Sequence, residues 1–140
     1  MSMGEDTNVI RPYGHELVLD LASCDERTFD RQHIRAFLEE LCERIGMERE
    51  DLHFWDYENA SQEELHEARQ NPHTFGVSAV QFIITSSVVV HTLPLLGQCY
   101  VNVFSCREFD PNAATEVALR HFDAGQMSRT LLERGAWLPE

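Results

Sequence analysis

The hydrophobic residues of this chain recur with two different periods, and each change of period marks a change of expected structure. Leu17, Leu19 and Leu21 alternate with other residues, which is the period of a strand with one buried face. A helical stripe follows, in which apolar residues recur at every third or fourth position: Ile34, Phe37, Leu38, Leu41 and Ile45. Gly46 suits the C-terminal end of that helix. The pattern therefore predicts a strand and then an amphipathic helix.

After this helix the apolar pattern is weaker. Residues 52–57 have the composition of a short strand. Ser61 and Glu64 have the spacing of a capping box, which opens a short polar helix that must end before Pro72. This part of the chain predicts one strand and one short helix.

The segment that begins at Gly76 is the richest in strand-forming residues. Three strands are expected in it, over residues 77–84, 88–92 and 99–105. Asp110 then suits a helix N-cap, with Pro111 at the first helical position. The helix that follows presents one apolar stripe: Ala114, Val117, Ala118 and Phe122. A last strand is expected over residues 127–132.

These elements predict the fold class. Amphipathic helices alternating with strands of one buried face indicate an α/β (α+β) two-layer sandwich, with an antiparallel sheet and helices packed on one face. A chain of 140 residues suits one domain. We expect that domain to span residues 13–140. Residues 1–12 are polar and lack periodicity, and they predict a flexible N-terminal arm.

The composition of the chain argues against two classes of binding partner, nucleic acid and membrane. The chain carries 24 acidic and 11 basic residues and a formal net charge of −13, whereas a nucleic-acid-binding surface needs clustered Lys and Arg. No apolar segment follows a basic region at the N-terminus, and the longest apolar run is too short to span a membrane. We therefore expect a cytoplasmic protein that binds neither nucleic acid nor membrane.

The spacing of the cysteines and histidines argues against both a metal site and a disulfide framework. The four cysteines, Cys24, Cys42, Cys99 and Cys106, include no C-x-x-C pair. In a cytosolic chain of this size they indicate free thiols rather than a disulfide framework. The seven histidines raise the alternative of a zinc site, but no two potential ligands have finger or ribbon spacing. No metal is expected.

Residues with catalytic potential lie at fixed offsets in the strand-rich segment. The apolar run breaks at Thr85 and Ser86; Ser78 lies eight residues before Ser86, His91 five after it and Cys106 twenty after it. Taken singly, each has an ordinary explanation as a turn serine, a hydrogen-bonded histidine or a small buried thiol. Together they supply a hydroxyl nucleophile, an imidazole base and a thiol acid.

These residue types and offsets resemble the prokaryotic S-adenosylmethionine decarboxylase family. In that family a Glu-Ser pair is the site of self-cleavage, and a His-Thr-Trp-Pro-Glu sequence follows. Residues 13–25 and 121–135 are similar to the family's opening strand and closing segment. Compared with this family pattern, the chain resembles a divergent member. Thr85 stands where the family has glutamate, and Leu93 and Leu95 stand where it has tryptophan and glutamate.

The resemblance implies a cofactor made from the chain itself. Cleavage between Thr85 and Ser86 would convert Ser86 into a covalent pyruvoyl group, whose ketone forms a Schiff base with the substrate amine and accepts electrons as CO2 leaves. The resemblance also implies that His91 is the base of processing, that Ser78 assists processing, and that Cys106 donates a proton to the decarboxylated carbon. A thiol suits that role because its reference pKa of about 8.5 leaves it protonated at neutral pH.

Strand geometry adds a condition to this assignment. Ser86 and His91 are five residues apart, so they point to opposite faces of an unbroken strand. We therefore expect a turn or kink near Ser86 and Ser87 that brings them together. Ser78 shares the face of Ser86 if the first strand is regular. Phe75, just before that strand, is expected to line the pocket.

The substrate expected from the resemblance is S-adenosylmethionine, for polyamine (spermidine) biosynthesis. In the family the positions of Leu93 and Leu95 help to hold the nucleoside, and a carboxylate there suits the two ribose hydroxyls. Leucine cannot accept those hydrogen bonds. A shifted amino-acid-type substrate, L-arginine or L-ornithine, is therefore an alternative.

Two other interpretations remain open. The first is an unprocessed relative that binds a small molecule without catalysis, which Thr85 before Ser86 allows. The second is a Cys-His hydrolase that uses Cys106 and His91. The resemblance also implies a homodimer whose active sites take residues from both subunits.

Overall fold

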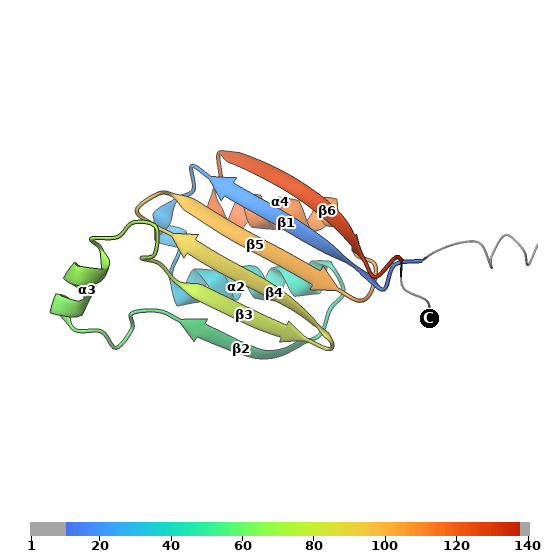
Figure 1. Cartoon of the computed structure of the whole chain (residues 1–140), viewed down its shortest axis with the longest axis horizontal. Coiled ribbons are helices and arrows are strands. Elements are labelled where there is room, and N and C mark those ends of the chain that lie inside the picture. The colour runs from blue at the N-terminus through green and yellow to red at the C-terminus, as the bar shows by residue number, and fades with distance from the viewer. Residues whose placement is uncertain (1–10, 138–140) are drawn as a thin grey trace, which may run out of the picture.

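Six antiparallel strands form one sheet with the order β2-β3-β4-β5-β1-β6 (Figure 1). The computed structural model describes residues 11–137, so most of the arm predicted for residues 1–12 lies outside the described residues. The strands are β1 Gly14–Ala22, β2 Arg49–Trp55, β3 Ser78–Ile83, β4 Ser86–Leu93, β5 Gln98–Ser105 and β6 Gln126–Arg134. Between them lie η1 Glu26–Thr28, α2 Arg31–Arg44, α3 Gln62–Ala68 and α4 Pro111–Phe122.

The helices determine which face of the sheet is covered. α2 and α4 lie side by side on one face, and α3 stands apart beyond the end of the sheet (Figure 1). No helix of residues 11–137 lies on the opposite face of the sheet (Figure 1). This arrangement confirms the predicted two-layer sandwich with helices on one face.

The core fills the space between the sheet and the two helices. Both predicted helical stripes are buried in it, and the fully buried rings of Phe37 and Phe122 have centroids 4.8 Å apart. Alternate strand residues enter the same layer: Leu17, Leu19, Leu21, Val88, Val90, Val101 and Val103. Burial of each large apolar side chain contributes about 1.5–3 kcal/mol. The apolar side chains that recur along the sequence therefore pack the two helices against the sheet.

Side chains cap the helices as the sequence predicts. Asp30 and Asp110 accept backbone N–H hydrogen bonds at the starts of α2 and α4. Ser61 and Glu64 form the predicted capping box at the start of α3, which ends at Ala68. Each cap satisfies backbone donors that have no partner inside the helix.

The turn between β3 and β4 differs from the prediction. A break was expected over Thr85, Ser86 and Ser87, but the turn consists of Ile84 and Thr85, and β4 already begins at Ser86. Ser86 can occupy an inward strand position because its Oγ accepts a hydrogen bond from the backbone N–H of Cys106. The polar residues therefore continue the strand instead of interrupting it.

Candidate active site

Ser86 and Cys106 form the first half of the site, at the turn end of β4. Ser86 is 7% exposed, and its Oγ lies 3.0 Å from the backbone nitrogen of Cys106, which donates to it. Cys106 directly follows β5, and its Sγ accepts a hydrogen bond from Thr85 Oγ1 at 3.4 Å. The predicted nucleophile, the residue before it and the predicted thiol acid are thus in mutual contact.

Thr85 has an unusual backbone conformation. Its φ angle is 53°, in the left-handed region that β-branched residues rarely adopt. A residue held in this region stores on the order of 1–3 kcal/mol of strain. The strained residue is also the one whose carbonyl precedes Ser86, the predicted site of cleavage.

Hydrogen bonds distinguish Cys106 from the other three cysteines. The hydroxyls of Thr85 and then Ser86 stabilise its thiolate and lower the pKa of Cys106. Burial has the opposite effect elsewhere: it raises the pKa of Cys24 and of Cys42 to about 11, and that of Cys99 well above the ordinary thiol value. Cys106 is therefore the cysteine with the environment of a reactive group.

Ser78 and His91 form the second half of the site. They are directly opposite each other on β3 and β4, and Ser78 Oγ lies 2.7 Å from His91 Nδ1. Gly76 permits this register, because a Cβ at that position would lie 1.6 Å from the Thr92 carbonyl oxygen. The pair borders a hollow of about 430 Å³ whose walls include Trp55, Leu93 and Tyr100.

The two halves lie at opposite ends of β4. Ser86 faces the helices with Val88 and Val90, whereas His91 is exposed on the uncovered face. The two residues are five positions apart, which spans about 17 Å along an extended strand. The kink expected near Ser86 and Ser87 is absent, because β4 is continuous from Ser86 to Leu93. Within one chain, therefore, His91 does not reach Ser86.

Ser78 also differs from its expected place. It was expected on the face of Ser86 along one regular strand, but the turn at Ile84 and Thr85 places the two serines on different strands. Ser78 therefore accompanies His91 instead of Ser86.

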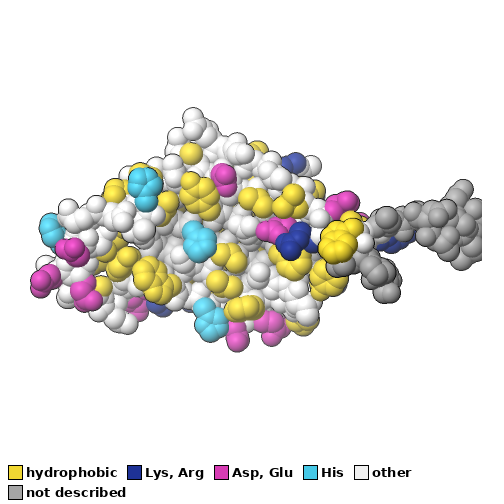
Figure 2. Space-filling model, viewed as in Figure 1, with side chains coloured by type: hydrophobic (Ala, Val, Ile, Leu, Met, Phe, Trp, Pro, Cys, Tyr) yellow, Lys and Arg dark blue, Asp and Glu magenta, His cyan; other side chains and the backbone are white. Residues whose placement is uncertain are grey.

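The uncovered face of the sheet is rich in apolar side chains. Figure 2 shows hydrophobic groups spread over this face among histidines and a few acidic groups. Trp55 is 61% exposed, Phe82 is 47% exposed and Leu132 is 44% exposed. These large apolar side chains are exposed on the face of the sheet that no described helix covers, so the face has the character of an interaction surface.

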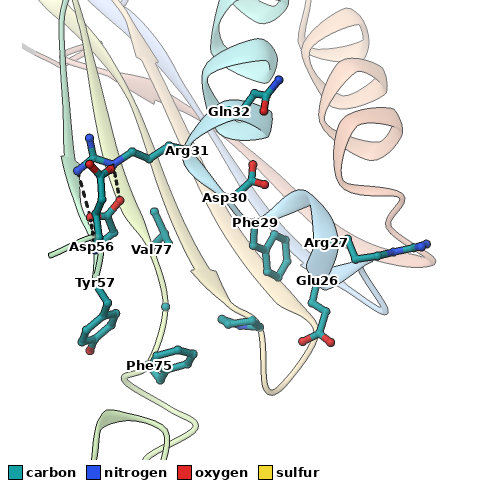
Figure 3. A pocket seen from close by; sticks show the side chains of 13 residues that line it. Glu26, Arg27, Phe29, Asp30, Arg31, Gln32, Asp56, Tyr57, Phe75 and Val77 are labelled. Carbon is teal, nitrogen blue, oxygen red and sulfur yellow. Dashed lines mark hydrogen bonds and ion pairs between the residues drawn. The ribbon is translucent and has the colours of Figure 1, made fainter. Parts of the chain in front are cut away.

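Two residues predicted to bind substrate lie away from the hollow beside His91. Phe75 is buried and stacks on Tyr57, with centroids 5.1 Å apart, in a different hollow at the same end of the sheet (Figure 3). Leu95 lies in the turn between β4 and β5. Of the three predicted substrate-binding residues, only Leu93 borders the hollow beside His91.

Two residues near the two halves, Tyr13 and Trp55, were not singled out from the sequence. Tyr13 stacks on Phe104, with centroids 6.2 Å apart, and contributes to the lowered pKa of Cys106. Trp55 and Tyr100 border the hollow beside His91. Tyr100 could be connected to the site from the sequence, because it has the same strand parity as Cys106. No sequence offset connects Tyr13 or Trp55 to the site.

The described residues include no group of three or more His, Cys, Asp or Glu side chains arranged to hold a metal ion. Among residues 11–137, no helix has the length and apolar character needed to cross a membrane.

Comparisons with known proteins match most of the chain. The model of the S-adenosylmethionine decarboxylase family matches residues 15–135. The S-adenosylmethionine decarboxylase proenzyme of Pyrococcus abyssi is 27% identical over 124 residues, which cover 87% of this chain and 78% of the relative. The proenzyme of the same name from Caldicellulosiruptor saccharolyticus is 28% identical over 124 residues, covering 87% of this chain and 88% of the relative.

A solved structure supports the fold. The crystal structure of the adenosylmethionine decarboxylase from Aquifex aeolicus aligns with a TM-score of 0.70 at 19% identity, over 89% of this chain and 92% of that chain. Its sheet and helix layers are therefore similar to those described above.

Proposed function

Because this chain belongs to the S-adenosylmethionine decarboxylase family of pyruvoyl-dependent carboxy-lyases in polyamine biosynthesis, we propose that Ser86 is the precursor of its pyruvoyl group. The contacts around Ser86 fit that role. Its hydroxyl is held by the Cys106 N–H, and it follows the strained residue Thr85. S-adenosylmethionine is the proposed substrate, and the cytoplasm is the proposed location.

Maturation proceeds in steps that the residues of this chain perform. The Ser86 oxygen attacks the Thr85 carbonyl carbon, the C–N bond breaks, and the hydroxyl proton passes to the released amine, which leaves an ester. His91 of the partner subunit takes the Cα proton of residue 86, a Cα–Cβ double bond forms, and the bond between Cβ and the ester oxygen breaks to release Thr85 as a carboxylate. The enamine takes up a proton at Cβ and becomes an imine, water adds at Cα, and ammonia leaves, so that residue 86 becomes a ketone that carries a methyl group.

That ketone supplies the electron sink for loss of CO2 from an α-amino acid. Cys106 Sγ holds the proton that the decarboxylated carbon receives. In the uncleaved chain the Thr85 and Ser86 hydroxyls lower the pKa of Cys106. Maturation removes the Ser86 hydroxyl, which is one of the donors that stabilise the thiolate. Cleavage therefore favours the protonated thiol that turnover requires.

The observation that carries the proposal is the division of the catalytic residues into two separate pairs. Ser78 and His91 share one hydrogen bond, and Ser86 and Cys106 share another, at opposite ends of β4. A base must come within hydrogen-bond reach of the proton that it takes. We therefore propose a homodimer in which the uncovered sheet faces pack together about a two-fold axis running across the strands.

Such a dimer completes two active sites. The axis places Ser86 and Cys106 of the partner subunit over Ser78 and His91 of the first, and the reverse at the second site. It also buries the exposed apolar surface around Phe82 and Trp55. Isologous packing of this kind is the commonest way for a chain to form a dimer.

Mixed dimers test this proposal. A subunit with His91→Ala and a differently tagged subunit with Cys106→Ala are each defective as homodimers. In the mixed dimer, one site combines an intact Ser86–Cys106 half with an intact Ser78–His91 half. We expect decarboxylase activity near half that of wild type, measured as CO2 release from the purified mixed dimer.

The cleavage pattern provides a sharper readout. The cleaved subunit of the mixed dimer should be the one that carries His91→Ala, because its partner supplies the imidazole. If that subunit stays intact and the mixed dimer is inactive, the site does not combine residues from two chains.

A further inference from the structure

Asp20 is a carboxylate without a partner on the sheet face that carries His91. It is exposed on β1, and it makes no side-chain hydrogen bond or ion pair with another described residue. On the central strands β4, β5 and β1, the uncovered face has only one other carboxylate, Glu16. Glu16 is already engaged, because it pairs with Arg134 at 2.5 Å and accepts a hydrogen bond from Asn102 at 2.9 Å. Asp20 is therefore the free negative charge on the uncovered face of these three strands.

The position of Asp20 connects it to the Ser78–His91 half of the site. Asp20 is directly opposite Tyr100, and Tyr100 is directly opposite His91. Two strand spacings place the Cα atoms of Asp20 and His91 roughly 10 Å apart. Tyr100 borders both the hollow beside His91 and a second hollow of about 280 Å³ whose walls include Asp20, Gln98 and Ser128. The two hollows are neighbours along one row of the sheet.

Three of the four carboxylates in the neighbouring hollow of Figure 3 are already engaged, and the fourth, Glu26, does not border the hollow beside His91. In the hollow of Figure 3, Arg31 pairs with Asp56 and Glu58. Asp30 in the same hollow contacts His33. The side chains that border the hollow beside His91 include no carboxylate at all. Asp20 is thus the nearest unengaged acid in that row.

We infer that Asp20 binds the distal positive charge of the substrate and thereby selects amino acids with a cationic side chain. Dimerisation through the uncovered face would remove Asp20 from bulk water, and a carboxylate buried without a cation is strongly disfavoured. Among the described strand residues, this face carries one guanidinium, that of Arg134, and Glu16 already pairs with it. A cationic substrate supplies the missing charge.

This inference rests on the proposed two-chain site and names the chemistry that its substrate must carry. The sulfonium of S-adenosylmethionine, the guanidinium of arginine and the terminal ammonium of ornithine share that chemistry. In each substrate the charged group would lie on the side of Tyr100 away from His91, and the carbon that loses CO2 would lie toward the ketone. The experiment below separates these sources of charge.

The test uses binding to the full-length Ser86→Ala protein, which does not depend on maturation. Affinity is measured for S-adenosylmethionine against its neutral counterpart S-adenosylhomocysteine, and for arginine against neutral citrulline. We expect at least one charged ligand to bind more tightly than its neutral counterpart. Adding Asp20→Asn should weaken the charged ligand by about ten- to a hundredfold and leave the neutral one unchanged. The pair that responds identifies the substrate charge.

Controls separate this inference from the proposed function. Glu133→Gln removes a carboxylate from β6 at a position opposite His15, on the helix-facing side of the sheet, and should change neither affinity. Failure of the chain to mature would contradict the proposed function but not this binding result. Equal losses for charged and neutral ligands, or no preference for charge in the Ser86→Ala protein, would overturn the role of Asp20. A weaker dimer with unchanged ligand preference would overturn it too, and would assign Asp20 to the subunit interface.

Discussion

Replacing His91 by alanine is expected to leave most of the chain uncleaved. Elimination at residue 86 needs a base for the Cα proton, and general bases contribute about 10²–10⁴ in rate. Ester formation at Thr85 does not need this base, so the variant should accumulate a chain that hydroxylamine cuts before residue 86. The extent of cleavage over time, measured by denaturing gel and mass spectrometry, gives the rate. His53→Ala is a matched control, because His53 lies on β2 on the same face of the sheet but contacts Phe82 instead of Ser78. This control should be cleaved normally.

Cys106→Ala should fail at a different stage. The variant retains Ser86 and His91, so we expect it to be cleaved at least partly. It should then turn over slowly, because the decarboxylated carbon has lost its proton donor. Full kcat in cleaved Cys106→Ala would contradict the role of this thiol, and normal maturation of His91→Ala would contradict the role of the imidazole.

Turnover of S-adenosylmethionine is expected to be weak until a carboxylate is restored in the turn after β4. Leu93 borders the hollow beside His91, and Leu95 lies in the following turn. Leucine accepts no hydrogen bond from a ribose hydroxyl, and each charge-assisted bond is worth about 1.5–3 kcal/mol. Leu95→Glu, alone or with Leu93→Trp, should therefore raise kcat/KM for S-adenosylmethionine by about one to two powers of ten per bond.

The controls for this prediction use the same turn and other substrates. Leu96→Glu adds the same charge one residue away and should give no gain. Arginine and ornithine lack a ribose, so Leu95→Glu should not improve their turnover. Efficient turnover of S-adenosylmethionine by the unmodified chain would show that other residues hold the nucleoside.

The fold was predictable because its apolar periods are strong and local. The helical stripes from Ile34 to Ile45 and from Ala114 to Phe122 are buried as expected. The turn between β3 and β4 was placed wrongly because Thr85 and Ser86 are both polar, and polarity alone does not distinguish a turn from an inward hydroxyl with a partner. That partner, the backbone N–H of Cys106, is twenty residues away in the sequence.

The candidate site was predictable as a set of residues but not as an arrangement. Strand parity indicated correctly that Ser86 and His91 point to opposite faces. A kink was the explanation expected for a single chain, and it was wrong because β4 is regular. The pairing of Ser78 with His91 depends on the register between β3 and β4, which the two-residue turn determines.

The mass of the freshly purified protein tests the central claim, self-cleavage before Ser86, most directly. We predict two fragments, residues 1–85 and residues 86–140, the smaller with a blocked N-terminus that an added amine and cyanoborohydride label at the ketone. Ser86→Ala should give only the full-length chain. A full-length, unlabelled mass for the unmodified protein under all conditions would contradict the proposed function and favour a non-catalytic binding protein. Cleavage between Ser86 and Ser87 would instead move the precursor to Ser87.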